Sequence, residues 1–264
     1  MTKQDPLAEV AALPGVAAAV AAARAAIDPL LLDRRLRTHG AALAEIATLR
    51  NAHASATLEG AEIPLEELQA GSADSPLSRV AFGAVEVQRS IRTHLGAPVR
   101  QVWASMATVA GREYLDETRR GRPRTADELA NDPLHTGIAY DADDVAVRLA
   151  MVVELLQQPT KAPALVVAAI AHGELLATQP FGAGNGVVAR AYAQLITAQR
   201  GLDPDLLCMM DVGLMSLGRS AYVRAIRDYD TGGAEGVANW VTHIASAFER
   251  GGAVARDVLE TLVA

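Results

Sequence analysis

Aromatic residues are scarce in this 264-residue chain: 4% of its positions are Phe, Trp or Tyr, although half of the residues are hydrophobic. The core must therefore be built mainly from alanine, leucine, valine and isoleucine. Small side chains let helix axes approach one another closely, so this composition favours packed helices. A chain of this length can bury a substantial core, in one domain with additions or in two small ones.

The sequence also lacks disulfide partners and long apolar runs. Its single cysteine, Cys208, cannot form an internal disulfide, which indicates a reducing compartment such as the cytoplasm. No uninterrupted run of about 18 apolar residues is present, which argues against a membrane span. Pro14 and Gly15 interrupt the alanine-rich N-terminus and Arg24 follows, so we expect no secretory signal.

Positive charge is in deficit, with a formal net charge of −7 and a pI of about 5.4. An acidic surface repels phosphate backbones, which argues against nucleic-acid partners. One short segment, Arg120-Gly121-Arg122-Pro123, resembles the core of a minor-groove AT-hook, but the match is only four residues long. The histidines show no metal-ligand spacing, so no metal site is predicted from them.

Helical periodicity covers most of the chain, and strand-like alternation is scarce. We therefore expect an all-α fold. The predicted helices cover residues 16–27, 30–58 (one or two helices), 64–70, 76–95, 98–114, 141–157, 162–178, 186–199, 217–228, 234–249 and 253–263. Residues 115–140 break this pattern with arginines, prolines and glycines, which predicts an exposed connection that could include a short hairpin.

The most informative segment is residues 179–190, Gln-Pro-Phe-Gly-Ala-Gly-Asn-Gly-Val-Val-Ala-Arg, between two predicted helices. Gly184 and Gly186 can adopt backbone angles closed to other residues, so their amides and that of Asn185 can point inward together. The following helix adds free N–H groups and the positive end of its dipole, which favours an anion. Arg190, one turn later, can add bidentate contacts to a phosphate. The plain alternative is a tight turn between two helices.

This segment resembles the motif of the Fic family, H-P-F-x-[D/E]-G-N-G-R-x-x-R. The matching positions are Pro180, Phe181, Gly184, Asn185, Gly186 and Arg190. Further similarity lies in Ala169-Ile170-Ala171-His172, Tyr222-Val223-Arg224-Ala225-Ile226, Gly232-Gly233 and Trp240. The resemblance spans roughly residues 50–250. It implies a Fic-type helical bundle in which residues 115–140 form a β-hairpin flap that docks a target protein.

Three positions depart from the motif. Gln179 stands where the family has its catalytic histidine, Ala183 where it has an acidic magnesium ligand, and Val187 where it has the first arginine. A glutamine amide is no base at neutral pH, and losing a general base commonly costs ~10²–10⁴ in rate. The resemblance therefore implies ATP or another nucleotide as ligand, while Ala183 puts magnesium in doubt and ordinary AMP transfer is not expected. His172 lies two turns before Gln179, roughly 10 Å away along a helix, so we assign it a structural role.

A second segment, Ser55-Ala56-Thr57-Leu58-Glu59-Gly60, ends a predicted helix. The carboxylate of Glu59 faces the negative end of the helix dipole there, at a cost of ~0.3–1 kcal/mol unless it is paired or solvated. Solvent is the plain explanation. The segment also matches the Fic inhibitory motif, [S/T]-x-x-x-E-[G/N], whose glutamate binds the second arginine of the family's loop motif. The resemblance implies that Glu59 pairs with Arg190 and that Ser55 belongs to an inhibitory helix.

We therefore expect N-terminal helices with the inhibitory helix over residues 1–75 and a Fic-like core over residues 76–264. The leading hypothesis is a degenerate Fic protein that binds a nucleotide or phosphate ligand without ordinary AMP transfer. The alternatives are an AMP transferase with an atypical base and an interaction module without ligand. Residues 115–140 are expected to contact a protein target that the sequence does not identify. The sequence also allows a homo-oligomer.

Overall fold

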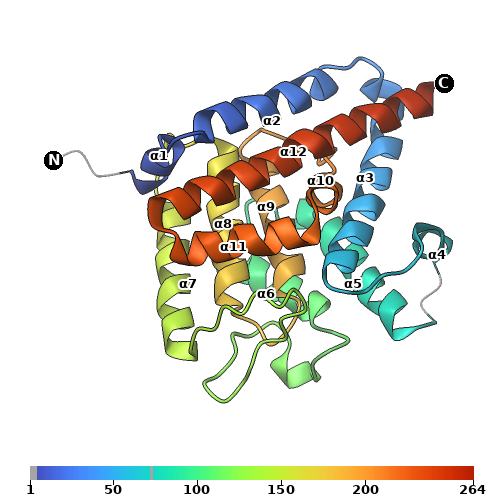
Figure 1. Ribbon diagram of the computed structural model, residues 1–264. Helices are drawn as coiled ribbons and strands as arrows, with labels where there is room; N and C mark the ends of the chain where they lie inside the picture. Colours follow the sequence, from blue (N-terminus) through green and yellow to red (C-terminus); the bar gives the residue numbers. More distant parts are fainter. Residues whose placement is uncertain (1–4, 72–73) are drawn as a thin grey trace.

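The computed structural model describes residues 5–71 and 74–264, and over these ranges the chain is a bundle of helices (Figure 1). The α-helices are α1 (Pro6–Ala11), α2 (Val16–Leu31), α3 (Leu36–Leu58), α4 (Leu65–Ala70), α5 (Pro76–Ser90), α6 (Val99–Ala110), α7 (Ala142–Gln157), α8 (Ala164–Thr178), α9 (Asn185–Gln199), α10 (Met210–Leu217), α11 (Arg219–Thr231) and α12 (Gly233–Val263). Short 3-10 helices cover Ile91–His94 and Glu117–Arg119. The expected all-α fold is confirmed.

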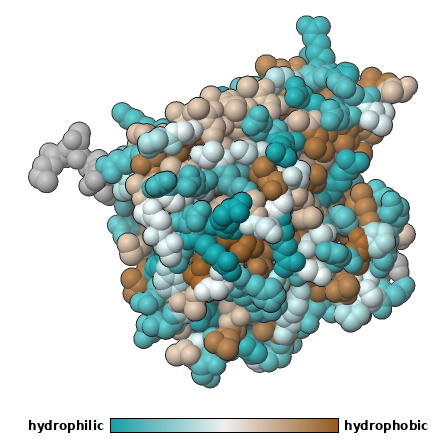
Figure 2. All heavy atoms as spheres, viewed as in Figure 1, coloured by the Kyte–Doolittle hydropathy of each residue, from teal (hydrophilic) through white to brown (hydrophobic). Residues whose placement is uncertain are grey.

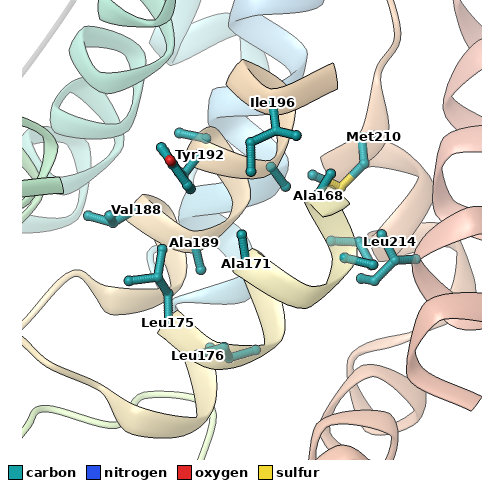
Figure 3. Close-up of a cluster of buried hydrophobic side chains, with 14 of the residues drawn as sticks. Ala168, Ala171, Leu175, Leu176, Val188, Ala189, Tyr192, Ile196, Met210 and Leu214 are labelled. Atoms are coloured by element: carbon teal, nitrogen blue, oxygen red, sulfur yellow. The ribbon is translucent and has the colours of Figure 1, made fainter. Parts of the chain in front are cut away.

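Helices α8 and α9 form the centre of the bundle, and the other helices surround them (Figure 1). Every residue of α9 from Asn185 to Ala198 is buried. Figure 3 shows the contact, where Ala171 of α8 faces Ala189 of α9 and larger side chains such as Leu175 pack around them. The core is therefore built from small aliphatic residues, as the composition predicts.

The N-terminal helices pack onto the same core as the rest of the chain. Helix α2 lies along α12 across the top of Figure 1, and α3 packs against α5 and α10. The C-terminal end of α3 thereby reaches the first turn of α9, so it brings Glu59 to the centre of the molecule. The division of the chain at residue 75 stays a prediction.

The C-terminal third differs from the expected helices in two ways. Helix α12 runs unbroken through Gly251 and Gly252, where we predicted a gap between two helices. A Cβ on Gly251 would lie 2.6 Å from the backbone of Met209, so this glycine serves close packing rather than a break. Helix α10 was not among the predicted helices, and it carries Gly213 in its middle. Its Cβ would lie 2.0 Å from the carbonyl oxygen of Ala247, so this glycine too allows two helices to touch.

Residues 115–140 lie beside the loop between α8 and α9 and are less exposed than expected, since Leu134 and Thr136 are buried. The expected hairpin is not formed: within the described ranges, the single β contact is an isolated antiparallel bridge between Pro123 and Phe181. In the same ranges, no helix has the length and apolarity needed to cross a membrane.

Candidate anion site at the start of α9

The loop between α8 and α9 is closed by the side chain of Asn185. Its Oδ1 accepts a hydrogen bond from the Phe181 amide at 2.9 Å, and its Nδ2 donates to the Phe181 carbonyl at 2.8 Å. Gly184, with φ of 77°, turns the chain into the helix. A Cβ on Gly184 would lie 2.6 Å from the Cβ of Ala110, so the turn requires glycine for both its backbone angle and its space.

Residues 123–131 hold this loop from one side. The Arg124 amide donates to the Pro180 carbonyl and the Asn131 amide donates to the Gly182 carbonyl, both at 2.8 Å. The guanidinium of Arg124 also donates to the Gln179 carbonyl at 3.0 Å. These backbone groups bond to the loop instead of to each other, which explains why the expected hairpin does not form.

Gln179 follows the last residue of α8 in a left-handed conformation, with φ of 45°. Its side chain is buried, and its Nε2 donates to the Thr136 hydroxyl at 3.2 Å. A primary amide has no accessible basic form, so this position offers hydrogen bonds but no general base. Ala183 and Val187, which replace the acidic residue and the first arginine of the motif, are buried and apolar.

The first turn of α9 offers free backbone donors. Among the described residues, the amides of Asn185, Gly186 and Val187 find no acceptor, and the first amide bonded across the turn is that of Val188, which donates to the Gly184 carbonyl. Free N–H groups and the positive end of the helix dipole favour an anion at this position.

Arg190 is fully buried one turn further along α9. Its Nε donates to the Ser55 hydroxyl at 2.9 Å, and its Nη2 donates to the Ser55 carbonyl at 3.1 Å and to Glu59 Oε1 at 2.9 Å. The ion pair expected between Glu59 and Arg190 is therefore present. Burial opposes the charge of Arg190, but nearby Glu59 raises the pKa of its guanidinium above the ordinary value, and Tyr222 and Asp211 add to this.

The third guanidinium nitrogen of Arg190, Nη1, is buried and has no hydrogen-bond partner among the described residues. It lies beside Gly186, since a Cβ built there would be 2.8 Å from Nη1 and 2.1 Å from Glu59 Oε1. Any side chain at position 186 would therefore displace the ion pair. The cation, the carboxylate and the free amides meet at a single turn of α9.

A buried carboxylic acid behind Arg190 was missed from sequence. Asp211, on the unpredicted helix α10, accepts hydrogen bonds from Gln88 Nε2 and Gln194 Nε2, each at 3.3 Å. Burial raises the pKa of Asp211 to about 7, although Arg190 and the hydrogen bonds oppose this shift. The flanking sequence Met-Met-Asp-Val-Gly-Leu carries no signal that could have singled it out.

His172 packs into an aromatic cluster below the loop. Its Nε2 shares a 2.6 Å hydrogen bond with the Tyr222 hydroxyl, and its ring lies edge-on to Trp240 with centroids 5.1 Å apart. Burial, together with Arg190 and His243, lowers the pKa of His172 well below its usual range, so the imidazole is neutral. These contacts are those of a packed residue rather than of a base facing a substrate.

The side chains of this loop do not fit a magnesium ion. Magnesium prefers carboxylate and other oxygen ligands, and Ala183 offers none from its side chain. Within the part of the chain that the structure describes, no three acidic, histidine or cysteine side chains gather in a way that could hold a metal ion.

Solved structures of Fic proteins share the fold of this chain. A Fic family protein from Desulfovibrio desulfuricans G20 aligns with a TM-score of 0.68 and 19% identity, over 99% of this chain and 76% of that chain. Fic-1 from C. elegans aligns with a TM-score of 0.69 and 19% identity, over 92% and 72%. A Fic domain containing signaling protein from Bacteroides thetaiotaomicron aligns with a TM-score of 0.69 and 12% identity, over 92% and 98%. No profile of a known family and no curated protein matches the sequence. The chain has the Fic fold.

Proposed function

We propose that this Fic-fold chain binds a nucleotide or another phosphate-bearing ligand at the first turn of α9 and does not carry out ordinary AMP transfer. One observation carries the proposal. Arg190 Nη1 is buried and has no hydrogen-bond partner of normal geometry among the described residues, although the Tyr222 hydroxyl also interacts with this guanidinium. Nη1 lies beside Gly186, at the turn where the amides of Asn185, Gly186 and Val187 are free. An unpaired cationic donor in a protein interior is costly, and a phosphate group at this turn would satisfy both sets of donors.

In this proposal Glu59 gates the site. Its carboxylate lies against Gly186 and holds Nη2 of Arg190, where an incoming phosphate would place its own oxygens. Two anions cannot share this turn, so the ligand must displace Glu59 from Arg190. Ser55 would keep its two hydrogen bonds to Arg190 during this exchange and hold the guanidinium in place.

The absence of ordinary AMP transfer rests on three positions. Gln179 supplies no base to remove a proton from an attacking hydroxyl. The side chain of Ala183 supplies no oxygen for the metal that neutralises phosphate charge, and Val187 supplies no cation for the charge that develops during transfer. Each loss removes a different contribution to transition-state stabilisation, so together they leave a binding site without the usual reaction.

Calorimetric titration of the full chain with ATP, ADP and AMP tests the proposed site. Removing the gate in Glu59→Gly should tighten nucleotide binding at least about tenfold, because the ligand no longer competes with a carboxylate. Glu62→Gly is the matched control, since Glu62 is an exposed glutamate three residues later in the same connection. If neither the wild type nor Glu59→Gly binds any nucleotide, the chain is better described as an interaction module without ligand.

Incubation with labelled ATP and either magnesium or manganese tests the absence of transfer. We expect no label on the protein or on proteins of a cell extract, for the wild type and for Glu59→Gly. Efficient labelling would favour the alternative, an AMP transferase with an atypical base.

We propose that residues 115–140 contact the target of such a transferase or another protein partner. Assembly into a homo-oligomer stays a prediction. We place the protein in the cytoplasm, because its only cysteine is buried and unpaired.

A further inference from the structure

A cavity lies between α11 and residues 133–136, outside the first turn of α9. Its volume is about 620 Å³, within the range of small-molecule pockets. The lining residues are Leu134, His135, Arg219, Ser220, Val223, Arg224, Arg227 and Asp228. In Figure 2, hydrophilic side chains surround a small hydrophobic area over α11, near the middle of the face shown.

The charge of this cavity is positive. Arg219, Arg224 and Arg227 face one acidic residue, Asp228, and no ion pair joins any of them to a carboxylate among the described residues. In a protein with a net charge of −7, such a concentration of unpaired arginines creates a local field that attracts anions.

Two of the arginines also shape the cavity wall. Arg227 donates from Nε to the Thr136 carbonyl at 2.5 Å and from Nη2 to the His135 carbonyl at 2.7 Å. Arg219 donates from Nη2 to the Pro133 carbonyl. These bonds fix the guanidinium groups in position and leave other N–H groups of each free for a ligand.

Arg224, in contrast, does not bond to the backbone of residues 133–136. It is exposed and donates no hydrogen bond to any residue that the structure describes, so all of its donors are available. Leu134 and Val223 supply apolar wall beside these donors. The combination of an apolar wall with several convergent arginines is suited to a small organic molecule that carries a phosphate group.

From this geometry we infer that the cavity between α11 and residues 133–136 binds the phosphate group of a small organic phosphate, independently of the gated turn of α9. The inference does not rest on the proposed function, since none of the cavity residues contacts Arg190 or Glu59. The two sites are nevertheless neighbours through Thr136. Its hydroxyl accepts from Gln179 and its carbonyl accepts from Arg227.

Titration of the wild-type full chain at low salt with inorganic phosphate, pyrophosphate and AMP tests this site. A ligand at the turn of α9 must displace Glu59, so binding of equal affinity in the wild type and in Glu59→Gly reports on the cavity. We expect Arg224→Ala to weaken binding about tenfold or more, which is the worth of one charge-assisted hydrogen bond, and Arg224→Glu to abolish it. Arg256→Glu makes the same charge change at an exposed position of α12 outside the cavity and should bind like the wild type.

The outcomes separate this site from the gated one. The cavity site is supported if phosphate binding is unchanged in Glu59→Gly and lost in Arg224→Glu, whatever the result at α9. Tighter binding of AMP than of inorganic phosphate would assign the organic part of the ligand to the wall of Leu134 and Val223. The inference is overturned if no probe binds at millimolar concentration, or if Arg224→Glu and Arg256→Glu weaken binding equally.

Discussion

The ion pair of Glu59 with Arg190 should be the most sensitive charged contact in this protein. Arg190 is fully buried and the side chain of Glu59 is 5% exposed, so neither charge is screened by water. Replacing Glu59 by glutamine keeps an oxygen that can accept from Nη2 but removes the negative charge. Arg190 then becomes a buried cation on which the carboxyl of Asp211 still acts, without a direct hydrogen bond between the two.

Removing one partner of a buried ion pair typically costs ~3–5 kcal/mol, because the remaining charge stays uncompensated. We expect about 3 kcal/mol for Glu59→Gln, at the low end, because the amide oxygen preserves one hydrogen bond. For a chain of this size each kcal/mol lowers the melting temperature by roughly 2–4 °C, so the midpoint should fall by roughly 6–12 °C.

Urea unfolding at constant pH measures the effect, provided that the slope of free energy against denaturant is the same in both proteins. The control is Glu45→Gln, which removes an ion pair to Arg89 whose side chains are 52% and 57% exposed. Exposed pairs contribute about 0–1 kcal/mol, so the control should change stability little. A loss in Glu59→Gln no larger than that of the control would refute the idea that Arg190 depends on Glu59 for its charge balance.

Three further predictions concern other parts of the chain. Because the pKa of Asp211 is raised to about 7 in the fold, above roughly 3.9 in an unfolded chain, its ionisation opposes folding as pH rises from about 4 to about 7. The stability of Asp211→Asn relative to wild type should therefore rise by about 2 kcal/mol between pH 5 and pH 7 in urea melts, and a constant difference would contradict the assignment. Gly251→Ala should cost about 1–3 kcal/mol, because the new Cβ would meet the backbone of Met209 at 2.6 Å. The same substitution at Gly40, where the nearest atom is 3.7 Å away, should be neutral or stabilise by up to about 1 kcal/mol, and equal effects at both sites would remove the packing explanation. Gln179→His alone should not produce AMP transfer in a labelled-ATP assay, because the acidic residue and the first arginine of the motif remain absent; rapid labelling would show that one base suffices.

Most helices and the loop at residues 179–185 could be predicted from residue types and their spacing along the sequence. The glycines and the asparagine of residues 184–186 predicted a tight turn into a helix, and the structure uses them in that way. Glu59 and Arg190 were paired by resemblance to a two-part motif, although 131 positions separate them, and the ion pair is present. The turn could be predicted because it depends on a few residue types at fixed spacing, whereas the pair was expected only from the resemblance.

Other features depend on which helices touch. Glycine is unfavourable inside helices on average, yet Gly213 and Gly251 lie within α10 and α12, because their neighbours in space need the room that a missing side chain leaves. Residues 115–140 could have closed on themselves as a hairpin, but their backbone groups bond to the loop that folding brings beside them.

The sequence by itself determined the all-α architecture and the glycine-rich turn into a helix, because these follow from residue type and local spacing, whereas the missing motif histidine and the charged pair were identified through the resemblance to the Fic motifs. Only the tertiary structure decided that Asp211 lies behind Arg190, that one nitrogen of Arg190 has no hydrogen-bond partner in the described part of the chain, and that three arginines line a cavity beside residues 133–136. Burial and the charge of neighbours far along the chain set these properties, and no local pattern records them.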